Sequence, residues 1–284
     1  MPSDVTLMAR KMRFVVVHYH IFKNAGTTVE RVLEREFPGC FSRLHGPSPE
    51  ATLDAEDLTA FLSDHPEVRA VTSHHLRYPL PSIRNVVIFD CCFLRHPLDR
   101  LDSMYSYLRK IDSTDPLCRS ARRHEPADFV RQLLDKSPEQ VSNVQVTHIA
   151  CRGAFTRPAN SADLECAAQT VRNMALPGVV EMFEESMVAG EYFMRPAFPS
   201  IRLGSAPTNV SRHVSPGAAE RDRRLMELWG RDLYRELARV NELDLHLFEL
   251  AADEIRRRLA VMPAVPERLA EFSARCRELA ISAG

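Results

Sequence analysis

The chain has 284 residues, of which 45% are hydrophobic, and its formal net charge is −1. This length suits one large domain or two small ones, and the apolar content suffices for a sizeable core. The near-neutral charge argues against general binding to nucleic acid or to an anionic membrane, while it leaves room for a local basic pocket. The first residues lack the order of a signal peptide, and no apolar run reaches membrane-spanning length. We therefore expect a cytoplasmic protein without a membrane span.

The cysteines carry little chemical signal. Seven are scattered along the chain, the number is odd, and no C-x-x-C pair occurs. This distribution favours reduced thiols over a disulfide framework or a zinc site, so no metal is expected.

In the first half of the chain, short apolar runs alternate with segments of helical periodicity. The run VVIFDCCFL is the strongest of these and predicts a central strand of a parallel sheet. Pro97 then suits the first turn of the following helix. The elements predicted here are a strand at 13–18, a helix at 26–37, a loop at 39–52, a helix at 53–64, strands at 68–72 and 86–94, and a helix at 97–110.

Helical patterns dominate the second half. The elements predicted here are helices at 127–134, 138–150 and 162–173, a strand at 178–182, a helix at 183–192, a long loop at 195–217, and helices at 218–239, 243–258 and 267–279. Together the two halves predict an α/β fold: a single domain, 1–284, with a short central parallel sheet flanked by helices. We expect a flexible N-terminus at 1–12 and a helical C-terminal part at 218–284.

The first strand is followed at once by a turn with the features of an anion site. The turn consists of Lys23, Asn24, Ala25, Gly26, Thr27 and Thr28. Free N–H groups at a helix start, together with the helix dipole, favour an anion there. The turn is not a Walker A loop, because the Lys precedes the only Gly, and its short length suits a single tetrahedral group. The alternative is an ordinary β–α turn capped by Asn24 or Thr27.

A second candidate anion site follows the strand at 86–94. Arg95 lies where that strand ends, and Ser103 lies two helical turns further on. A guanidinium can bind a phosphate through two parallel hydrogen bonds, and a Ser hydroxyl can donate to the same group. The alternative is that Arg95 pairs with Asp99 or Asp102 at the helix start.

The two motifs in this order resemble the sulfotransferases that use 3′-phosphoadenosine 5′-phosphosulfate (PAPS). The closest resemblance is to the carbohydrate branch, typified by Golgi enzymes acting on glycosaminoglycans. That branch has a first motif of roughly H-I-P-K-T-G-G-T-S/T, where this chain has the segment His20–Thr28. Its second motif is roughly R-x-P-x-x-R-x-x-S-x-Y/F, which is matched by Arg95, Pro97, Arg100, Ser103 and Tyr105.

The resemblance implies a P-loop-like sulfotransferase fold and a role for each motif. Lys23–Thr28 would bind the 5′-phosphosulfate of PAPS, and Arg95 with Ser103 would bind its 3′-phosphate. Phe22 and Ala25 depart from the family, which has Pro and Gly there, and an Ala at this position is expected to keep φ below zero. Weaker matches lie at 143–153, at 179–186, where the family has V-G-x-x-E-x-F-x-x-S, and at 208–211.

A histidine is expected to serve as the catalytic base. The segment 71–80 resembles the family's G-H-L-x-Y-x-L segment, in which His75 takes the histidine position and His74 the glycine position. His75 is the favoured base and His74 the alternative, because a neutral imidazole can accept a proton near pH 7. The simpler interpretation is that one caps the strand end while the other faces water.

These observations predict a soluble, bacterial-style sulfotransferase. It would move a sulfuryl group from PAPS to a hydroxyl of a carbohydrate or glycan-like acceptor by in-line displacement, with Lys23 neutralising developing charge. The alternatives are a nucleotide-dependent, kinase-like phosphotransferase and a non-catalytic nucleotide-binding module. The partner is thus a small molecule or a glycan, whose identity the sequence does not give; nor does it give the oligomeric state.

Overall fold

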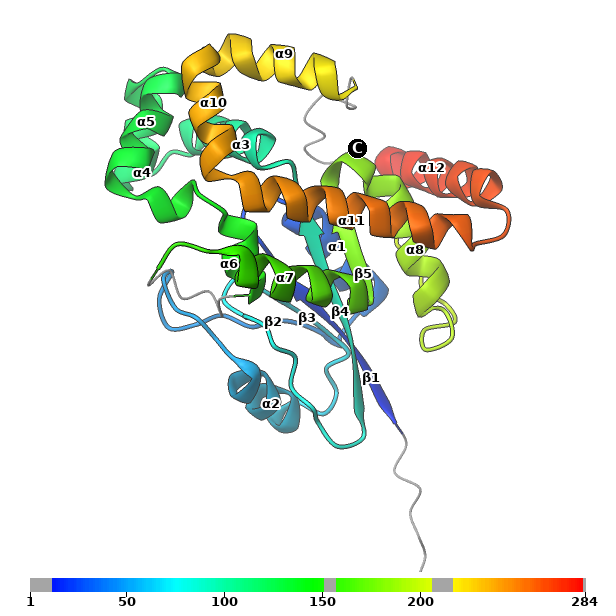
Figure 1. Cartoon of the computed structure of the whole chain (residues 1–284). Coiled ribbons are helices and arrows are strands. Elements are labelled where there is room, and N and C mark those ends of the chain that lie inside the picture. The colour runs from blue at the N-terminus through cyan, green and yellow to red at the C-terminus, as the bar shows by residue number, and fades with distance from the viewer. Residues whose placement is uncertain (1–11, 151–156, 206–216, 283–284) are drawn as a thin grey trace, which may run out of the picture.

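A five-stranded, entirely parallel sheet forms the centre of the molecule (Figure 1). The computed structural model describes residues 12–150, 157–205 and 217–282. The strand order is β2-β3-β1-β4-β5. The strands are β1 (Arg13–Tyr19), β2 (Phe41–Arg43), β3 (Ala70–Ser73), β4 (Val86–Leu94) and β5 (Leu176–Val179). The predicted α/β class with a short parallel sheet flanked by helices is confirmed.

The chain order of the strands places the topological switch point of the sheet between β1 and β4, and we call the region beyond the carboxyl ends of these two strands the crevice. These two strands pair along their length, from Arg13 opposite Val86 to Tyr19 opposite Cys92. The chain leaves β1 toward β2 and β3 on one side, whereas it leaves β4 toward β5 on the other side. In open parallel sheets, ligands bind at such a switch point, beyond the carboxyl ends of the strands.

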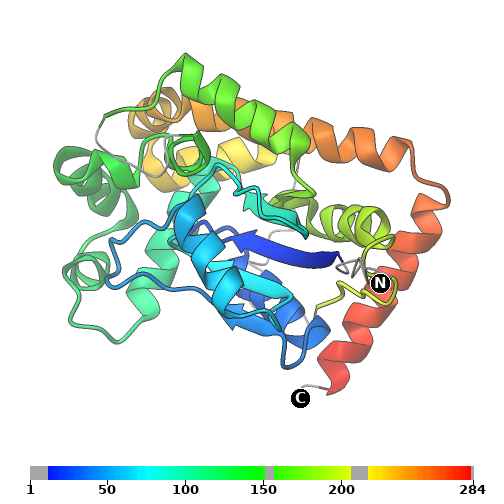
Figure 2. The same cartoon turned by 90° about the horizontal axis from the view of Figure 1, so that it is seen from below.

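Helices cover both faces of the sheet (Figures 1 and 2). They are α1 (Gly26–Glu36), α2 (Ala55–Asp64), α3 (Pro97–Lys110), α4 (Pro116–Arg123), α5 (Pro126–Lys136), α6 (Val144–Ala150), α7 (Ser161–Asn173), α8 (Phe183–Met194), α9 (Ala218–Trp229), α10 (Arg231–Val240), α11 (Glu242–Ala260) and α12 (Val265–Ser282). Short 3₁₀ turns occupy Pro138–Gln140 and Val180–Met182. None of the helices in the described ranges combines the length and apolar composition that crossing a bilayer requires.

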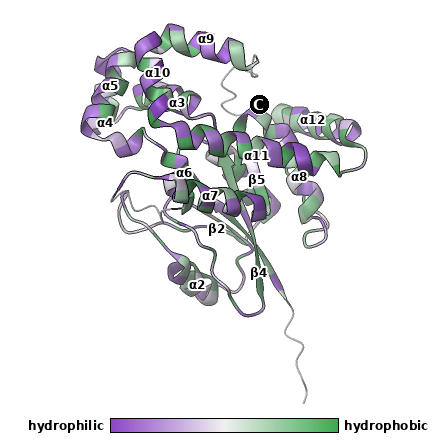
Figure 3. Cartoon of the chain, in the orientation of Figure 1, coloured by the Kyte–Doolittle hydropathy of each residue, from purple (hydrophilic) through white to green (hydrophobic). Residues whose placement is uncertain are grey.

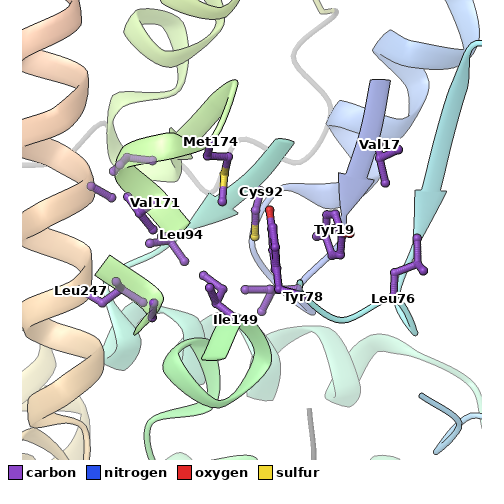
Figure 4. Close-up of a cluster of buried hydrophobic side chains, with 14 of the residues drawn as sticks. Val17, Tyr19, Leu76, Tyr78, Cys92, Leu94, Ile149, Val171, Met174 and Leu247 are labelled. Atoms are coloured by element: carbon purple, nitrogen blue, oxygen red, sulfur yellow. The ribbon is translucent and has the colours of Figure 1, made fainter. Parts of the chain in front are cut away.

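Alternate residues of the strands feed two separate cores, because successive side chains of a strand point to opposite faces. On one face, Tyr19 and Cys92 pack with residues of α2, α6, α7 and α11, and Figure 4 shows part of this cluster. On the other face, Val16 and Phe93 pack with residues of α1, α8 and α12. A third cluster joins α3, α4, α5, α9 and α10. Figure 3 shows the hydropathy that corresponds to these clusters: the strands are mostly hydrophobic, whereas the helices carry both hydrophobic and hydrophilic residues.

Most predicted elements are found, including the strand at 86–94 and the helix at 97–110 with unchanged bounds. The predicted strand at 178–182 is shifted, because the chain turns into the 3₁₀ segment directly after Val179. The predicted helix at 218–239 is broken at Gly230, whose φ of 77° no helix interior accepts. The predicted loop at 39–52 contains β2, and α4 was not predicted. Within the long loop at 195–217, residues 206–216 lie outside the described residues, as do 1–11 of the N-terminus.

Candidate functional site

The two predicted anion motifs meet at the crevice between β1 and β4. The Lys23–Thr28 turn follows β1, and Arg95 directly follows β4. Arg95 donates a hydrogen bond from Nη1 to the Lys23 carbonyl over 3.2 Å. The Asn24 amide donates from Nδ2 to the Phe93 carbonyl over 2.8 Å. The turn after β1 is therefore bonded to the end of β4, so the two motifs form one site.

The turn adopts a conformation that side chains disfavour. Lys23 and Ala25 both have left-handed backbone angles, with φ of 68° and 60°. The expectation that Ala25 keeps φ below zero is wrong. A left-handed L-residue other than Gly costs about 1–2 kcal/mol, and such strain persists only where the surroundings impose it. Left-handed residues in a turn bring successive N–H groups to one side, which is the geometry of an anion-binding concavity.

The start of α1 presents fewer free donors than the sequence indicated. The Thr28 N–H donates to the Ala25 carbonyl over 2.9 Å, so it is not available to a ligand. The N–H groups of Gly26 and Thr27 have no hydrogen-bond acceptor within the described part of the chain. Thr27 is exposed and Thr28 is half-buried. Two backbone donors and the Thr27 hydroxyl are thus open at the helix start.

Asn24 stabilises the turn from within and does not face a ligand. It is 1% exposed, and its Nδ2 donates to Gln145 Oε1 over 2.7 Å as well as to the strand end. The proposed capping role for Asn24 or Thr27 is not seen, because the N-cap of α1 is Ala25 and no side chain caps it.

Gln145, on α6, joins both turns and was not singled out by the sequence. Its Oε1 accepts from the Arg95 N–H over 2.9 Å, and its Nε2 donates to the Arg95 carbonyl over 2.8 Å. Asp244 of α11 accepts from the N–H groups of Gln145 and Val146, which fixes the start of α6. A fully buried amide therefore holds Asn24 and the Arg95 backbone in register.

Lys23 is a partly buried cation. Burial, with Arg95 and Lys110, lowers its pKa to about 8. Its Nζ lies 3.9 Å from the ring centroid of Tyr107 on α3, and Tyr107 packs edge-on against Phe22. Both of these aromatic residues are exposed, at 42% and 38%. Lys23 thus reaches across the crevice mouth to the helix that carries Ser103.

Arg95 has no carboxylate partner within 4 Å among the described residues. The carboxylates that the sequence offered as partners, Asp99 and Asp102, instead bind Arg224 of α9. Arg95 is half-buried, and its Nε has no hydrogen-bond partner. Ser103 is half-buried on α3, one turn before Tyr107 on the same face. A guanidinium left without an acid at a strand end can bind an anionic ligand.

Histidines line the β1–β3 side of the crevice. The His20 ring lies against Gly26, where an added Cβ would come within 1.8 Å of it, so this glycine is required by close packing. The His74 ring packs against the His20 ring with centroids 3.6 Å apart and the planes tilted by 31°, and its Nδ1 donates to the His20 carbonyl over 3.0 Å. Burial is the largest cause of the lowered pKa of His74. His74 is therefore a neutral imidazole whose Nε2 lone pair is not used by that bond.

His75 turns away from this pair of rings toward the segment after β2. Its Nδ1 accepts from the Gly46 N–H over 2.5 Å, so the lone pair of the neutral ring is already engaged. Burial, with His45 and Arg77, lowers the pKa of His75, and a hydrogen bond to the Pro49 backbone acts in the opposite direction. The ring thus anchors a loop.

Glu181 is a further site residue, which the sequence indicated only through a weak match. It lies just beyond β5, and its Oε1 accepts from the His96 N–H over 3.0 Å. Burial raises its pKa to about 7, against the opposing charge of Arg95. The described residues contain no group of three His, Cys, Asp or Glu side chains arranged to hold a metal ion.

The fold and the crevice define an α/β protein with a candidate anion-binding site at the switch point of a parallel sheet. No model of a known protein family matches the chain. It is similar to an uncharacterized protein of Archaeoglobus fulgidus, which is 29% identical over 247 residues, or 85% of this chain and 97% of that protein. The similarity extends over most of both chains and carries no functional assignment.

Proposed function

We propose that the protein is a PAPS-dependent sulfotransferase with a P-loop-like fold, acting on a hydroxyl of a carbohydrate or glycan-like acceptor. The observation that carries this proposal is the hydrogen bond from Arg95 to the Lys23 carbonyl, which unites the two motifs in one crevice. A nucleotide with both a 5′ chain and a 3′-phosphate requires two anion sites that belong to one binding site. The resemblance of both motifs to the carbohydrate branch supports the choice of PAPS over other nucleotides.

Each end of the nucleotide has its own set of donors. Lys23, with the free N–H groups of Gly26 and Thr27, would hold the 5′-phosphosulfate at the start of α1. Arg95 and Ser103 would hold the 3′-phosphate at the end of β4. Asn24, Ala25 and Thr28 shape the turn and would not donate side-chain bonds to the ligand.

His74, not His75, is the better base in this geometry. The His74 Nε2 lone pair is not committed to the backbone, and its ring is separated from the Lys23–Thr28 turn only by the His20 ring. In the transfer, the acceptor oxygen bonds to sulfur while the bond from sulfur to the bridging phosphate oxygen breaks. His74 would take the acceptor proton, and Lys23 would stabilise the charge that develops on the leaving oxygen.

Binding of the product nucleotide tests this proposal before any acceptor is known. Adenosine 3′,5′-bisphosphate should raise the melting temperature more than ADP does, because only the former has a group for Arg95. We expect Lys23→Ala and Arg95→Ala each to weaken its binding by roughly 100-fold, since charge-assisted hydrogen bonds are lost.

The exposed Arg235 supplies the control, because Arg235→Ala removes a guanidinium far more accessible than Arg95 and should leave the affinity unchanged. If neither Lys23→Ala nor Arg95→Ala weakens binding, the assignment of the site is wrong. If both variants weaken binding, transfer of labelled sulfate to a panel of hydroxyl acceptors would identify the acceptor. Turnover of ATP with magnesium would instead indicate the kinase-like alternative.

A further inference from the structure

Glu181 places a carboxyl group at the edge of the crevice that Arg95 occupies. The last paired residues of β4 and β5 are Leu94 and Val179, so Glu181 lies opposite His96 as both strands end. Its Oε1 is held by the His96 N–H over 3.0 Å. Its Oε2 is buried and has no hydrogen-bond partner among the described residues. A buried carboxyl oxygen without a donor is costly unless something else satisfies it.

The charges around this carboxyl come from three elements. Arg95 at the end of β4 and Asp99 on α3 act on it in opposite directions. Asp99 is itself bound by Arg224 of α9, with Arg221 3.9 Å away. The imidazole of His96 is neutral, because burial and the neighbouring arginines lower its pKa to about 3. Glu181 makes no ion pair within 4 Å in the described residues, so the charge of Arg95 acts on it only from a longer distance.

Its place in the sheet assigns Glu181 to the nucleotide and not to the proton transfer at His74. His74 follows β3, which lies three strands away from β5 in the sheet. Neighbouring strands are about 4.8 Å apart, so the two residues are separated by roughly 14 Å. Glu181 lies instead next to the strand that delivers Arg95.

We propose that Glu181 binds the same phosphate group as Arg95 in its protonated form, so that the ligand and one proton are taken up together. This inference rests on the proposed function, because it adds a residue to the 3′-phosphate site. A protonated Oε2 can donate to a phosphate oxygen, which satisfies the buried atom, whereas the carboxylate would repel the phosphate. The negative ligand raises the pKa of Glu181 further and thereby draws the proton in.

Calorimetric titration with adenosine 3′,5′-bisphosphate measures this coupling. Relative to Glu181→Gln, we expect the affinity of the wild type to fall about fivefold from pH 7 to pH 8 and to approach a tenfold fall per pH unit above that, as for a single proton taken up at a group with a pKa of about 7. At pH 8, titrations in two buffers of different ionisation enthalpy should show about one proton more taken up by the wild type than by Glu181→Gln, because Lys23, with a pKa of about 8, contributes equally to both.

Glu181→Gln separates the proposal from a merely structural role. The amide keeps the acceptor for the His96 N–H and supplies a permanent donor in place of Oε2–H. We expect this variant to bind at pH 8 within about threefold of the wild-type affinity at pH 6, with only the fractional proton uptake that Lys23 contributes. Glu184→Gln, at an exposed position on α8, is the matched control and should behave as wild type. The pH dependence of the affinity of Glu181→Gln also reports the titration of the ligand's own phosphates, which can then be subtracted from that of the wild type.

The outcomes separate the two proposals. If the wild type takes up no more protons with the bisphosphate than Glu181→Gln does, or if Glu181→Gln loses binding while remaining folded, the role of Glu181 is refuted and the proposed function stands. If the bisphosphate does not bind at pH 6, the proposed function fails, and inorganic pyrophosphate becomes the probe for Glu181. Proton uptake with pyrophosphate that Glu181→Gln abolishes would support the Glu181 site alone, and its absence would overturn it.

Discussion

The two halves of the crevice differ in how they carry charge. The half formed by β1 and β3 is lined by His18, His20 and His74, and burial lowers the pKa of all three. The half formed by β4 and β5 is lined by Arg95 and Glu181. We call the first the neutral half and the second the charged half. Uncharged lone pairs suit proton acceptance, whereas a permanent guanidinium suits phosphate binding. The Lys23–Thr28 turn lies between the halves and contacts both.

The sharpest test of this division is to remove the base without touching the charged half. His74→Ala should lower the rate of sulfate transfer to a confirmed acceptor by 10²–10⁴-fold, roughly the contribution of a general base. The affinity for adenosine 3′,5′-bisphosphate should change by less than about threefold, because Arg95 and Lys23 remain. Initial rates and calorimetry measure the two quantities.

His75→Ala is the matched control for this experiment. It removes the acceptor of the Gly46 N–H, so we expect a loss of stability with a rate within about tenfold of wild type. A larger fall in rate for His75→Ala than for His74→Ala would restore His75 as the base and contradict the role of the neutral half.

Gln145 connects the two sides of the crevice, so its removal should disturb both. Gln145→Leu leaves the Asn24 amide and the Arg95 backbone without their buried partners. We expect a loss of about 3 kcal/mol in the free energy of unfolding, measured by urea denaturation. Gln169→Leu, at an exposed position on α7, should change the stability by less than about 0.5 kcal/mol. Equal stabilities for the two variants would show that the halves are held together by other contacts.

The sequence indicated the two candidate anion turns but not what joins them. Lys23–Thr28 and Arg95 were found because each is a local strand–turn–helix signal. Gln145 acts on Asn24 across 121 residues, and Glu181 acts on His96 across 85, so no local pattern carries either contact. The preference for His75 came from alignment with a motif, whereas the difference between His74 and His75 depends on which ring nitrogen the fold engages.

The neutral half should be the part of the site most sensitive to acid. Burial lowers the pKa of His18 to about 3, and its Nδ1 contacts Thr72 Oγ1 at 2.9 Å. Because an unfolded histidine titrates near 6.5, the unfolded chain binds more protons below that pH and the folded state loses stability down to about pH 3.

From pH 7 to pH 5, His18 alone should contribute a loss of about 2 kcal/mol. His18→Asn should flatten the pH dependence of the unfolding free energy by that amount, whatever its effect at pH 7. His246→Gln, at an exposed position on α11, should leave the slope unchanged. An unchanged slope in His18→Asn would mean that this histidine is not kept neutral.

Replacing Ala25, whose backbone is left-handed, should have a smaller effect on stability, and this effect should be stabilising. Ala25→Gly should raise the free energy of unfolding by about 1 kcal/mol, because glycine adopts φ of 60° without steric cost. Gly39 supplies the reciprocal control: it has φ of 72° and no atom near an added Cβ, so Gly39→Ala should lower the stability by a similar amount. A destabilised Ala25→Gly would show that the turn between the halves is not strained at this residue.

Substitution of Tyr107 should give the smallest effect on ligand binding. Tyr107 lies on α3, the helix that follows β4, and its ring contacts Lys23. Tyr107→Leu removes the ring that lies 3.9 Å from Nζ, and a cation–π contact of this kind contributes about 0.5–1 kcal/mol. Adenosine 3′,5′-bisphosphate should therefore bind about threefold more weakly. The Lys23 charge is lost as the pH rises through its pKa of about 8, and without the ring this loss should occur at lower pH.

Tyr107→Phe keeps the ring face and should match wild type in both affinity and pH midpoint. The comparison is cleanest in the Glu181→Gln background, where the titration of Glu181 no longer overlaps that of Lys23. Because Tyr107 is 42% exposed, Tyr107→Leu should leave the stability nearly unchanged, which separates a positioning role from a structural one. If Tyr107→Phe weakens binding as much as Tyr107→Leu, the hydroxyl itself contacts the ligand, and α3 contributes a donor in addition to positioning Lys23.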